Sequence, residues 1–298
     1  MPTTRRLLLA AAASMLGLAA APAWAAEKVV VAFAGSMGVV MDRGLGPVFS
    51  ARTGTRFEGI GQGAMALAHL LAGRALNADV FVSISAGPVK VVEAAGLAEG
   101  AVPFASTEMV LAYAPESAYA ARFARAGADW RKILAAPGLR FGRTDPASDP
   151  QGQYVLYALQ LAEAYYKLPG FAARVAGAVE NPAQIFAEPS LLARLQDGQI
   201  DATLTYKSAA VSQRLPFIEL PPEVNLSDPA LATTWYGRAG LSLDGKTLHP
   251  GPLVFYAAVL KNAPNPRAAA AFAAFLSSPA GQAILARDGY GPGKGESI

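Results

Sequence analysis

Glycine and small polar residues follow the apolar segments of this sequence at three places. They are Gly35-Ser36, Gly61-Gln62-Gly63-Ala64 and the segment 83–87, which reads SISAG. Where such a turn opens a helix, free backbone N–H groups and the partial positive charge of the helix end suit an anion. Each turn taken alone also fits a helix cap or a tight turn. The chemistry that these residues offer together is the binding of a small anion.

No catalytic constellation accompanies these turns. The two histidines, His69 and His249, lack the spacing of a metal site. Gly35-Ser36-Met37-Gly38 lacks the glycine that a nucleophile elbow needs two residues before the serine. Gly293-Lys294-Gly295 is no phosphate-binding P-loop, because Asp288 stands where a glycine is required. The sequence therefore predicts a binding protein without a cofactor, and not an enzyme.

Alternating strand and helix patterns must position the three turns. Apolar, β-branched runs at 28–34 and 78–83 predict buried parallel strands, each followed by a helical segment. Such alternation predicts an α/β fold. In an open parallel sheet the turns after the strands lie at one edge, where ligands bind. The turns form one site if they share that edge.

Residues 1–26 have the pattern of an export signal that is removed. A basic start with Arg5 and Arg6 precedes an apolar run from Leu7 to about Ala21, and the small-x-small pattern Ala23-Trp24-Ala25 follows it. The apolar run, about 15 residues, is shorter than the roughly 20 that span a membrane. An uncleaved anchor or a buried helix is the alternative. Thr4–Leu9 resembles a twin-arginine signal, although two arginines also suit the general route, and either route predicts a periplasmic protein.

The composition excludes several classes of protein. The chain has 298 residues, 53% of them apolar, and no cysteine. This length suggests two compact units, and the apolar fraction is too high for disorder. The absence of cysteine excludes disulfides and cysteine-ligated metals. The net charge of +3, which falls to about +1 without Arg5 and Arg6, offers no excess of cations for nucleic acid.

Several motifs together resemble the periplasmic solute-binding proteins of the molybdate/tungstate type, the capture subunits of ABC importers. Ala34-Gly35-Ser36 and ADVFVS at 78–83 are shared with many solute-binding families. The loop 144–152, TDPASDPQG, is more specific. Together with Tyr206-Lys207-Ser208 and Asn225-Leu226-Ser227, it points to the tungstate-binding branch.

The resemblance implies a two-lobe α/β fold, the type II periplasmic-binding-protein architecture, with a mainly parallel sheet in each lobe. Lobe one would comprise residues 27–108 and 222–298, and lobe two residues 109–221. Crossovers near 107–110 and 220–225 would join the lobes. The ligand would bind in the cleft between them and favour a hinge-closed state, which the membrane subunits of an importer would recognise.

The resemblance assigns two turns of lobe one to the ligand. Ser36, beside Gly35, would donate to an anion oxygen. The second turn supplies Gln62, Gly63 and Ala64, where relatives usually carry a serine. Because that hydroxyl is missing here, only backbone N–H groups and the Gln62 amide can serve.

The resemblance assigns four further residues in lobe two. Asp149 matches a carboxylate that can coordinate the tungsten of a bound anion, the only metal-ligating role expected. Gln151 lies nearby in the sequence. Tyr206 matches a tyrosine whose hydroxyl can reach the anion or hold the two lobes together. The residue before that tyrosine is a glutamate in many tungstate binders but Thr205 here. A carboxylate beside a dianion is repulsive unless it bonds to the metal centre or is protonated, so its loss favours a four-coordinate anion held by neutral donors.

Three of these assignments have structural alternatives: Ser36 as a helix cap, Asp149 as a turn former facing solvent, and Tyr206 as a core or hinge residue. The resemblance predicts a monomer that captures tungstate or molybdate for an ABC importer. Sulfate or another small anion is the alternative ligand. A sensor or accessory binding protein, and a periplasmic enzyme on the same fold, are the alternative functions.

Overall fold

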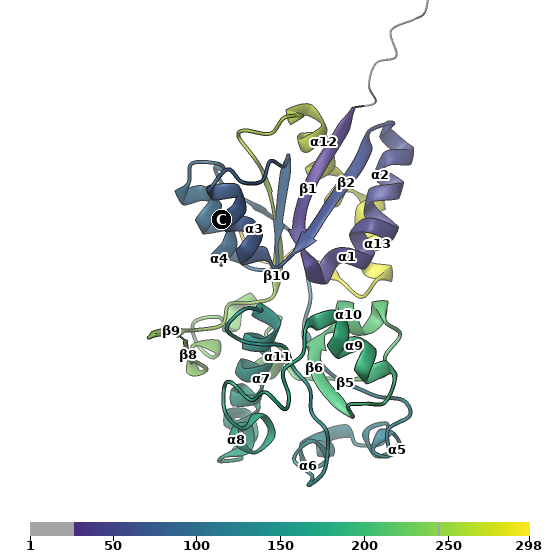
Figure 1. Ribbon diagram of the computed structural model, residues 1–298, viewed down its shortest axis with the longest axis vertical. Coiled ribbons are helices and arrows are strands. Elements are labelled where there is room, and N and C mark those ends of the chain that lie inside the picture. The colour runs from purple at the N-terminus through teal and green to yellow at the C-terminus, as the bar shows by residue number, and fades with distance from the viewer. Residues whose placement is uncertain (1–26, 244) are drawn as a thin grey trace, which may run out of the picture.

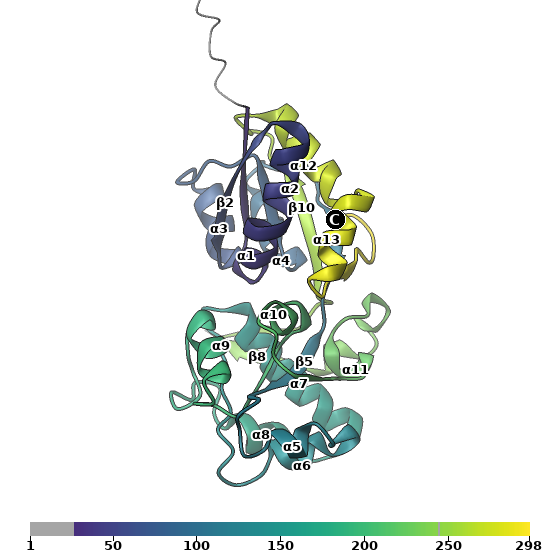
Figure 2. The same ribbon diagram turned by 90° about the vertical axis from the view of Figure 1, so that its right-hand side faces the viewer.

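The computed structural model describes residues 27–243 and 245–298, which form two lobes joined by two crossing segments (Figures 1 and 2). The export signal predicted at 1–26 lies outside the described residues. Each lobe contains a β-sheet with helices packed against it, and the chain passes from one lobe to the other and back. This is the two-lobe α/β arrangement expected from the sequence.

The sheet of lobe one has six strands. They are β1 (Lys28–Ala34), β2 (Arg56–Gln62), β3 (Val80–Ser83), β4 (Val102–Ser106), β10 (Val254–Val259) and β11 (Gly291–Pro292). Their spatial order is β11-β4-β10-β3-β1-β2. β1 pairs in parallel with β2 and β3, whereas β10 and β11 pair antiparallel with their neighbours. The central strands are apolar along their length because helices cover both faces of the sheet.

Helices cover lobe one on both sides (Figures 1 and 2). α3 (Ala64–Ala72) and α4 (Ala86–Ala94) lie on one face, and α2 (Gly46–Thr53), α12 (Pro266–Leu276) and α13 (Pro279–Arg287) on the other. α2 packs on α12 through the rings of Phe49 and Phe272, 5.1 Å apart and edge to face. A 3₁₀ turn, Gly35–Met37, and α1 (Gly38–Val40) directly follow β1.

The sheet of lobe two consists of β5 (Met109–Tyr113), β6 (Ala202–Tyr206) and β7 (Phe217–Glu219), in the order β6-β5-β7. Both pairings are antiparallel. This differs from the expected mainly parallel sheets, as does the mixed sheet of lobe one. β5 leads away from the crossing, whereas β6 ends at the cleft, so the two strands run in opposite directions.

The helices of lobe two surround this sheet. They are α5 (Ala120–Phe123), α6 (Trp130–Leu134), α7 (Pro150–Tyr166), α8 (Phe171–Ala176), α9 (Glu188–Gln196), α10 (Lys207–Ser212) and α11 (Pro222–Asn225). A small hairpin, β8 (Leu241–Leu243) and β9 (Lys246–Leu248), completes the lobe. None of the helices in the described ranges is by itself long and apolar enough to span a membrane. Helices α12 and α13 reach that length and apolar character only when they are counted together, and they are bent by 59° relative to each other.

The return crossing lies later in the chain than the expected 220–225. The first crossing falls between Ser106 at the end of β4 and Met109 at the start of β5. The second precedes β10, where the N–H of Thr107 donates to the carbonyl oxygen of Leu253 at 3.1 Å. The two crossing segments therefore lie side by side.

Residues 222–252 pack on lobe two, which corrects the expected boundary at 222. The side chain of Gln160 in α7 bonds the backbone of Gly240 in both directions, at 3.0 and 2.9 Å. The ring of Trp235 meets that of Tyr165 edge to face at 6.3 Å. α11 also packs against α7. These contacts hold residues 222–252 against α7, so the chain returns to lobe one only after them.

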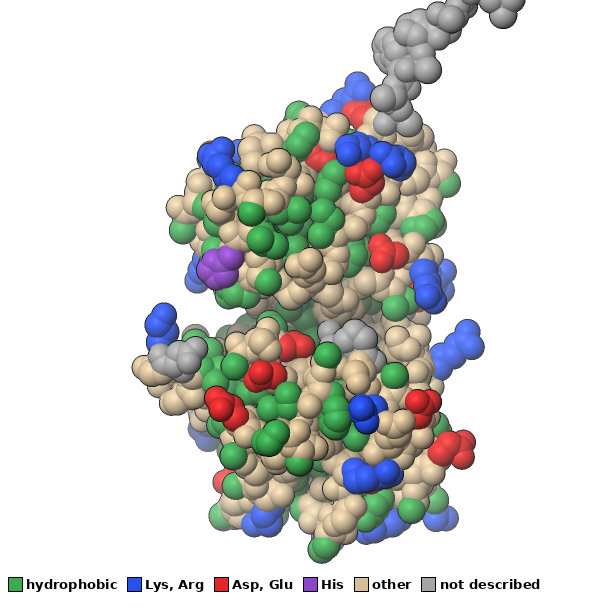
Figure 3. Space-filling view, viewed as in Figure 1, with side chains coloured by type: hydrophobic (Ala, Val, Ile, Leu, Met, Phe, Trp, Pro, Cys, Tyr) green, Lys and Arg blue, Asp and Glu red, His purple; other side chains and the backbone are tan. Residues whose placement is uncertain are grey.

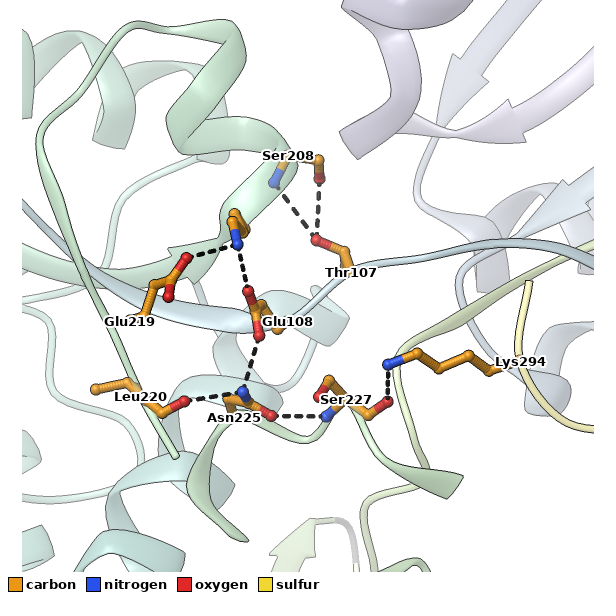
Figure 4. A network of polar contacts seen from close by, with 9 residues as sticks. Thr107, Glu108, Ser208, Glu219, Leu220, Asn225, Ser227 and Lys294 are labelled. Carbon is orange, nitrogen blue, oxygen red and sulfur yellow. Dashed lines mark hydrogen bonds and ion pairs between the residues drawn. The ribbon is translucent and has the colours of Figure 1, made fainter. Parts of the chain in front are cut away.

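A polar network holds the crossing region (Figure 4). Glu108 accepts from Lys207 Nζ at 2.7 Å and from Asn225 Nδ2 at 2.8 Å. Lys294, which follows β11 of lobe one, donates to the carbonyl oxygen of Ser227 in lobe two at 3.1 Å. The crossing is therefore tied to both lobes by directional bonds.

Candidate ligand-binding site

A cavity of about 440 Å³ lies between the two lobes. The face shown in Figure 3 is hollowed into a furrow at the same level, between the upper and lower lobes. Both lobes contribute to the cavity wall. Lobe one supplies Ala34, Gly35, Ser36, Gly63, Ala64 and Ile84, and lobe two supplies Thr144, Asp145, Ser148, Asp149, Pro150, Ile185, Phe186, Ala187 and Tyr206.

Two strand-to-helix turns form most of the wall of lobe one, and Ile84 from the turn after β3 adds to it. Ser36 lies in the 3₁₀ turn directly after β1, and Gly63 is the N-cap residue of α3. β1 pairs with β2 so that Ala34 lies opposite Gln62, which brings the two turns together at one edge of the sheet. The first N–H groups of a helix have no partner within the helix, so these two turns present donors to the cavity.

The turn at Ser36 is fixed from the far end of the chain. The hydroxyl of Tyr290 donates to the carbonyl oxygen of Ser36 at 3.2 Å. Tyr290 is buried and its ring contacts Phe255 in β10. The donors of this turn are thus held in place before any ligand binds.

Asp149 forms the N-terminus of α7 in the wall of lobe two. Its Oδ1 accepts the N–H of Gln151 at 2.9 Å, and Pro150 occupies the first helical position. The helix passes close to the preceding loop, because a Cβ atom at Gly152 would lie 2.5 Å from the carbonyl oxygen of Thr144. Glycine at position 152 therefore allows Thr144, Asp145 and Asp149 to share one wall.

The described part of the cavity lining contains two carboxylates, Asp145 and Asp149, and no lysine, arginine or histidine. Burial raises the pKa of Asp149, and the carboxylate of Asp145 adds to this effect. The hydrogen bond from the N–H of Gln151 to Oδ1 of Asp149 acts in the opposite direction. An anion in this cavity must therefore be held by backbone N–H groups and hydroxyls.

The structure brings most of the predicted site residues together but leaves three outside the cavity wall. Gly35, Ser36, Gly63, Ala64, Asp149 and Tyr206 line it. Gln62 is exposed and lies outside the lining. Gln151 and Thr205 are 1% and 0% exposed, and the Nε2 of Gln151 donates to the Oγ1 of Thr205 at 3.1 Å. These two side chains bond each other behind the wall, and the buried Oε1 of Gln151 has no hydrogen-bond partner in the described part of the chain.

Sequence reasoning missed one wall entirely. Ile185, Phe186 and Ala187 line the cavity although no motif marks them. They are held there because the N–H of Arg143 donates to the carbonyl oxygen of Gln184 at 2.8 Å and the N–H of Phe186 to that of Arg143 at 3.0 Å. Thr144, Asp145 and Ser148 were also not singled out, although they belong to the loop 144–152 that carried the resemblance.

No group of three or more histidine, aspartate or glutamate side chains in residues 27–243 and 245–298 is placed to hold a metal ion. The role expected for Asp149 concerns the central atom of a bound oxyanion, which would be the cargo of the protein.

Comparison with known proteins identifies the family of this chain. The model for bacterial extracellular solute-binding proteins matches residues 29–291. The chain belongs to this family. Among its relatives, the molybdate/tungstate-binding protein WtpA of Pyrococcus abyssi is 33% identical over 205 residues, which cover 62% of this chain and 59% of that protein. A putative ABC transporter molybdenum-binding protein of Haloferax volcanii is 31% identical over 232 residues, 78% of this chain and 72% of that protein.

The fold of this solute-binding protein is also found in solved structures. The periplasmic molybdate-binding protein of Azotobacter vinelandii aligns with a TM-score of 0.60 at 16% identity, covering 89% of this chain and all of that one. The two-lobe type II fold and the resemblance to molybdate/tungstate-type proteins are thereby confirmed. The chain spans about 60% of the length of the first relatives that it matches.

Proposed function

We propose that this solute-binding protein captures a small oxyanion, tungstate or molybdate, in the periplasm and delivers it to the membrane subunits of an ABC importer. The names of the Pyrococcus abyssi and Haloferax volcanii relatives support this ligand class. The export signal pattern at 1–26 and the extracellular description of the family support the location.

The observation that carries the proposal is the convergence of three helix or turn starts on one cavity. Ser36 follows β1, Gly63 and Ala64 open α3, and Asp149 and Pro150 open α7. The first two present unpaired N–H groups to a shared space, and Ser36 adds a hydroxyl. A tetrahedral oxyanion has acceptors on all sides, so these donors of lobe one and the hydroxyls of Thr144 and Ser148 in the wall of lobe two can bind it at once.

Binding between the lobes couples ligand capture to a change of shape. An anion that contacts Ser36 in lobe one and the start of α7 in lobe two gains all its bonds only when the walls approach. It therefore favours the closed state by its difference in affinity for the two states. The closed state is the form that importer subunits would select.

Asp149 has a specific part in this proposal. A carboxylate near a dianion is unfavourable unless it bonds to the central atom or carries a proton. Molybdenum and tungsten can accept an additional oxygen ligand, whereas sulfur in sulfate cannot. Asp149 therefore favours tungstate and molybdate over sulfate.

Thermal melts of the purified protein with molybdate, tungstate, sulfate and phosphate test the proposal. A ligand at about a thousand times its dissociation constant stabilises the folded state by about 4 kcal/mol. We expect the largest rise in melting temperature with tungstate or molybdate. A largest rise with sulfate would support the alternative ligand, and no rise with any of the four would refute capture of an oxyanion.

A further inference from the structure

A buried cation directly precedes, in the chain, two residues of the acidic wall of the cavity. Arg143 is 0% exposed. The next two residues, Thr144 and Asp145, line the cavity. Asp145 and Asp149 are the charged side chains of the described lining, and the carboxylate of Asp145 acts electrostatically on Arg143.

The guanidinium of Arg143 has only neutral partners. Its Nη2 donates to the carbonyl oxygens of Ala178 and Val179 at 3.0 and 2.6 Å, and its Nε to Gln184 Oε1 at 3.3 Å. Its Nη1 has no partner, and no ion pair involves Arg143 among the residues that the structure describes. Burial lowers the pKa of Arg143 and the carboxylate of Asp145 raises it, and an arginine side chain remains protonated in proteins. The charge is therefore present and has no ion-pair partner among the described residues.

A buried charge without a counter-ion is unfavourable, because protein atoms solvate it less well than water. An anion in the adjacent cavity would supply the missing opposite charge. In surroundings of low dielectric constant this attraction extends beyond direct contact. Arg143 can thus stabilise a bound anion without touching it, and can offset the repulsion from Asp145 and Asp149.

Arg143 also organises the wall that sequence reasoning missed. Its side chain bonds the backbone at Ala178 and Val179, and its own backbone pairs with Gln184 and Phe186. These bonds hold the segment that carries Ile185–Ala187 against the cavity. A purely structural arginine would affect all ligands of the cavity alike.

We propose that Arg143 sets the charge selectivity of the cavity: its buried, unneutralised guanidinium favours doubly charged over singly charged tetrahedral anions. This inference rests on the proposed function, because it takes a tetrahedral oxyanion as the ligand. A dianion is attracted twice as strongly as a monoanion by the same positive charge. If Arg143 only positioned the neutral residues of the wall, the affinities of the two anions would change equally.

Tungstate and perrhenate separate charge from shape. Both are tetrahedral oxyanions of similar size, but tungstate carries two negative charges and perrhenate one. Titration calorimetry gives the ratio of their affinities for the native protein and for variants. We expect Arg143→Met to lower the tungstate-to-perrhenate ratio by about tenfold. Arg143→Lys keeps the charge and loses the planar fork, so it should lose thermal stability but keep the ratio within about threefold.

Arg140→Met is the matched control. Arg140 precedes the same cavity segment, but its charge is neutralised by Asp201, which it contacts at 2.7 Å. Its loss should lower the melting temperature and leave the tungstate-to-perrhenate ratio unchanged. A fall in this ratio comparable to that of Arg143→Met would overturn the specific role of Arg143.

If Arg143→Met does not fold, a second variant tests the same inference. Gln184→Glu places a carboxylate on the Nε of Arg143 and neutralises the guanidinium without removing it. We expect the same fall in the ratio. An unchanged ratio in a folded variant with the charge removed or neutralised would overturn this inference alone, whereas failure of the native protein to bind either anion would overturn the proposed function with it.

Discussion

The side-chain amide of Gln151 donates to the hydroxyl of Thr205 at 3.1 Å, on the side of β6 that faces away from the cavity. Successive residues of a strand point to opposite faces. Tyr206 lines the cavity, so its neighbour Thr205 points into the interior of lobe two, where Gln151 of α7 meets it. The bond thus supports the position of α7, whose first residue and N-cap form the cavity wall.

Thr205→Val should cost about 1–2 kcal/mol of unfolding free energy, because the Nε2 of Gln151 loses a buried acceptor. Anion affinity should change by no more than roughly twofold, since neither side chain lines the cavity. Chemical denaturation and titration calorimetry measure the two effects. Thr203→Val is the control, because its hydroxyl bonds only the carbonyl oxygen of Leu204. A loss of anion affinity of about tenfold or more in Thr205→Val would place Thr205 in the binding site.

Ser36→Ala should weaken anion binding by about 1–3 kcal/mol, because a hydrogen bond to a charged acceptor is lost. The backbone turn should persist, since it is held through the carbonyl oxygen of Ser36 by Tyr290. Calorimetric titration with tungstate measures the effect. Ser212→Ala is the matched control, a half-buried serine outside the cavity lining. Equal affinities of Ser36→Ala and the native protein would remove the Ser36 hydroxyl from the site.

Gly152→Ala should weaken anion binding by about tenfold or more and destabilise the fold by about 1–3 kcal/mol. The added Cβ would meet the backbone of Thr144, Asp145 and Pro146 at 2.5–2.8 Å, so the loop in the cavity wall must move. Gly38→Ala is the control, because a Cβ there meets nothing within 4 Å. Native affinity in Gly152→Ala would show that the close approach of α7 to the loop is not needed for binding.

Asp201→Asn should lower the unfolding free energy by about 2 kcal/mol near neutral pH, less than for a fully buried pair because Arg140 is half exposed. Burial opposes ionisation of Asp201, but hydrogen bonds from Arg140 and Ser117 outweigh it and lower the pKa of this carboxyl. A lowered pKa in the folded state gives stability that is present above the ordinary pKa. That stability is lost as pH falls below about 4.

Denaturation at a series of pH values checks this prediction. The difference in stability between the native protein and Asp201→Asn should be constant near neutrality and shrink in acid. A difference that grows as pH falls would contradict the direction of the pKa shift.

The sequence predicts the edge of lobe one well because the signal there is local. Gly35-Ser36 and Gly63-Ala64 each follow a strand and begin a helix, and the pairing of β1 with β2 brings them together. Parallel neighbouring strands end at the same edge whatever their exact lengths, so small errors in the expected bounds do not move the turns apart.

The parts that the sequence does not reveal depend on contacts between distant segments. Ile185–Ala187 are held at the cavity by backbone hydrogen bonds between their segment and Arg143. Backbone pairing of this kind does not depend on residue type, so the sequence does not predict it. Residues 222–252 were expected in lobe one because the resemblance placed the return crossing near 220–225. Their packing on Gln160 and Tyr165 of α7 instead keeps them there. The placement of Thr205 behind the wall follows from strand alternation and could have been expected.

Anomalous diffraction from crystals grown with tungstate tests the central claim most directly, because tungsten can be located independently of the protein atoms. The account predicts one strong tungsten peak between the lobes, within bonding distance of the Ser36 turn and of the start of α7 at Asp149. A tungsten peak elsewhere on the protein, or none in crystals of a protein saturated with tungstate, would contradict it.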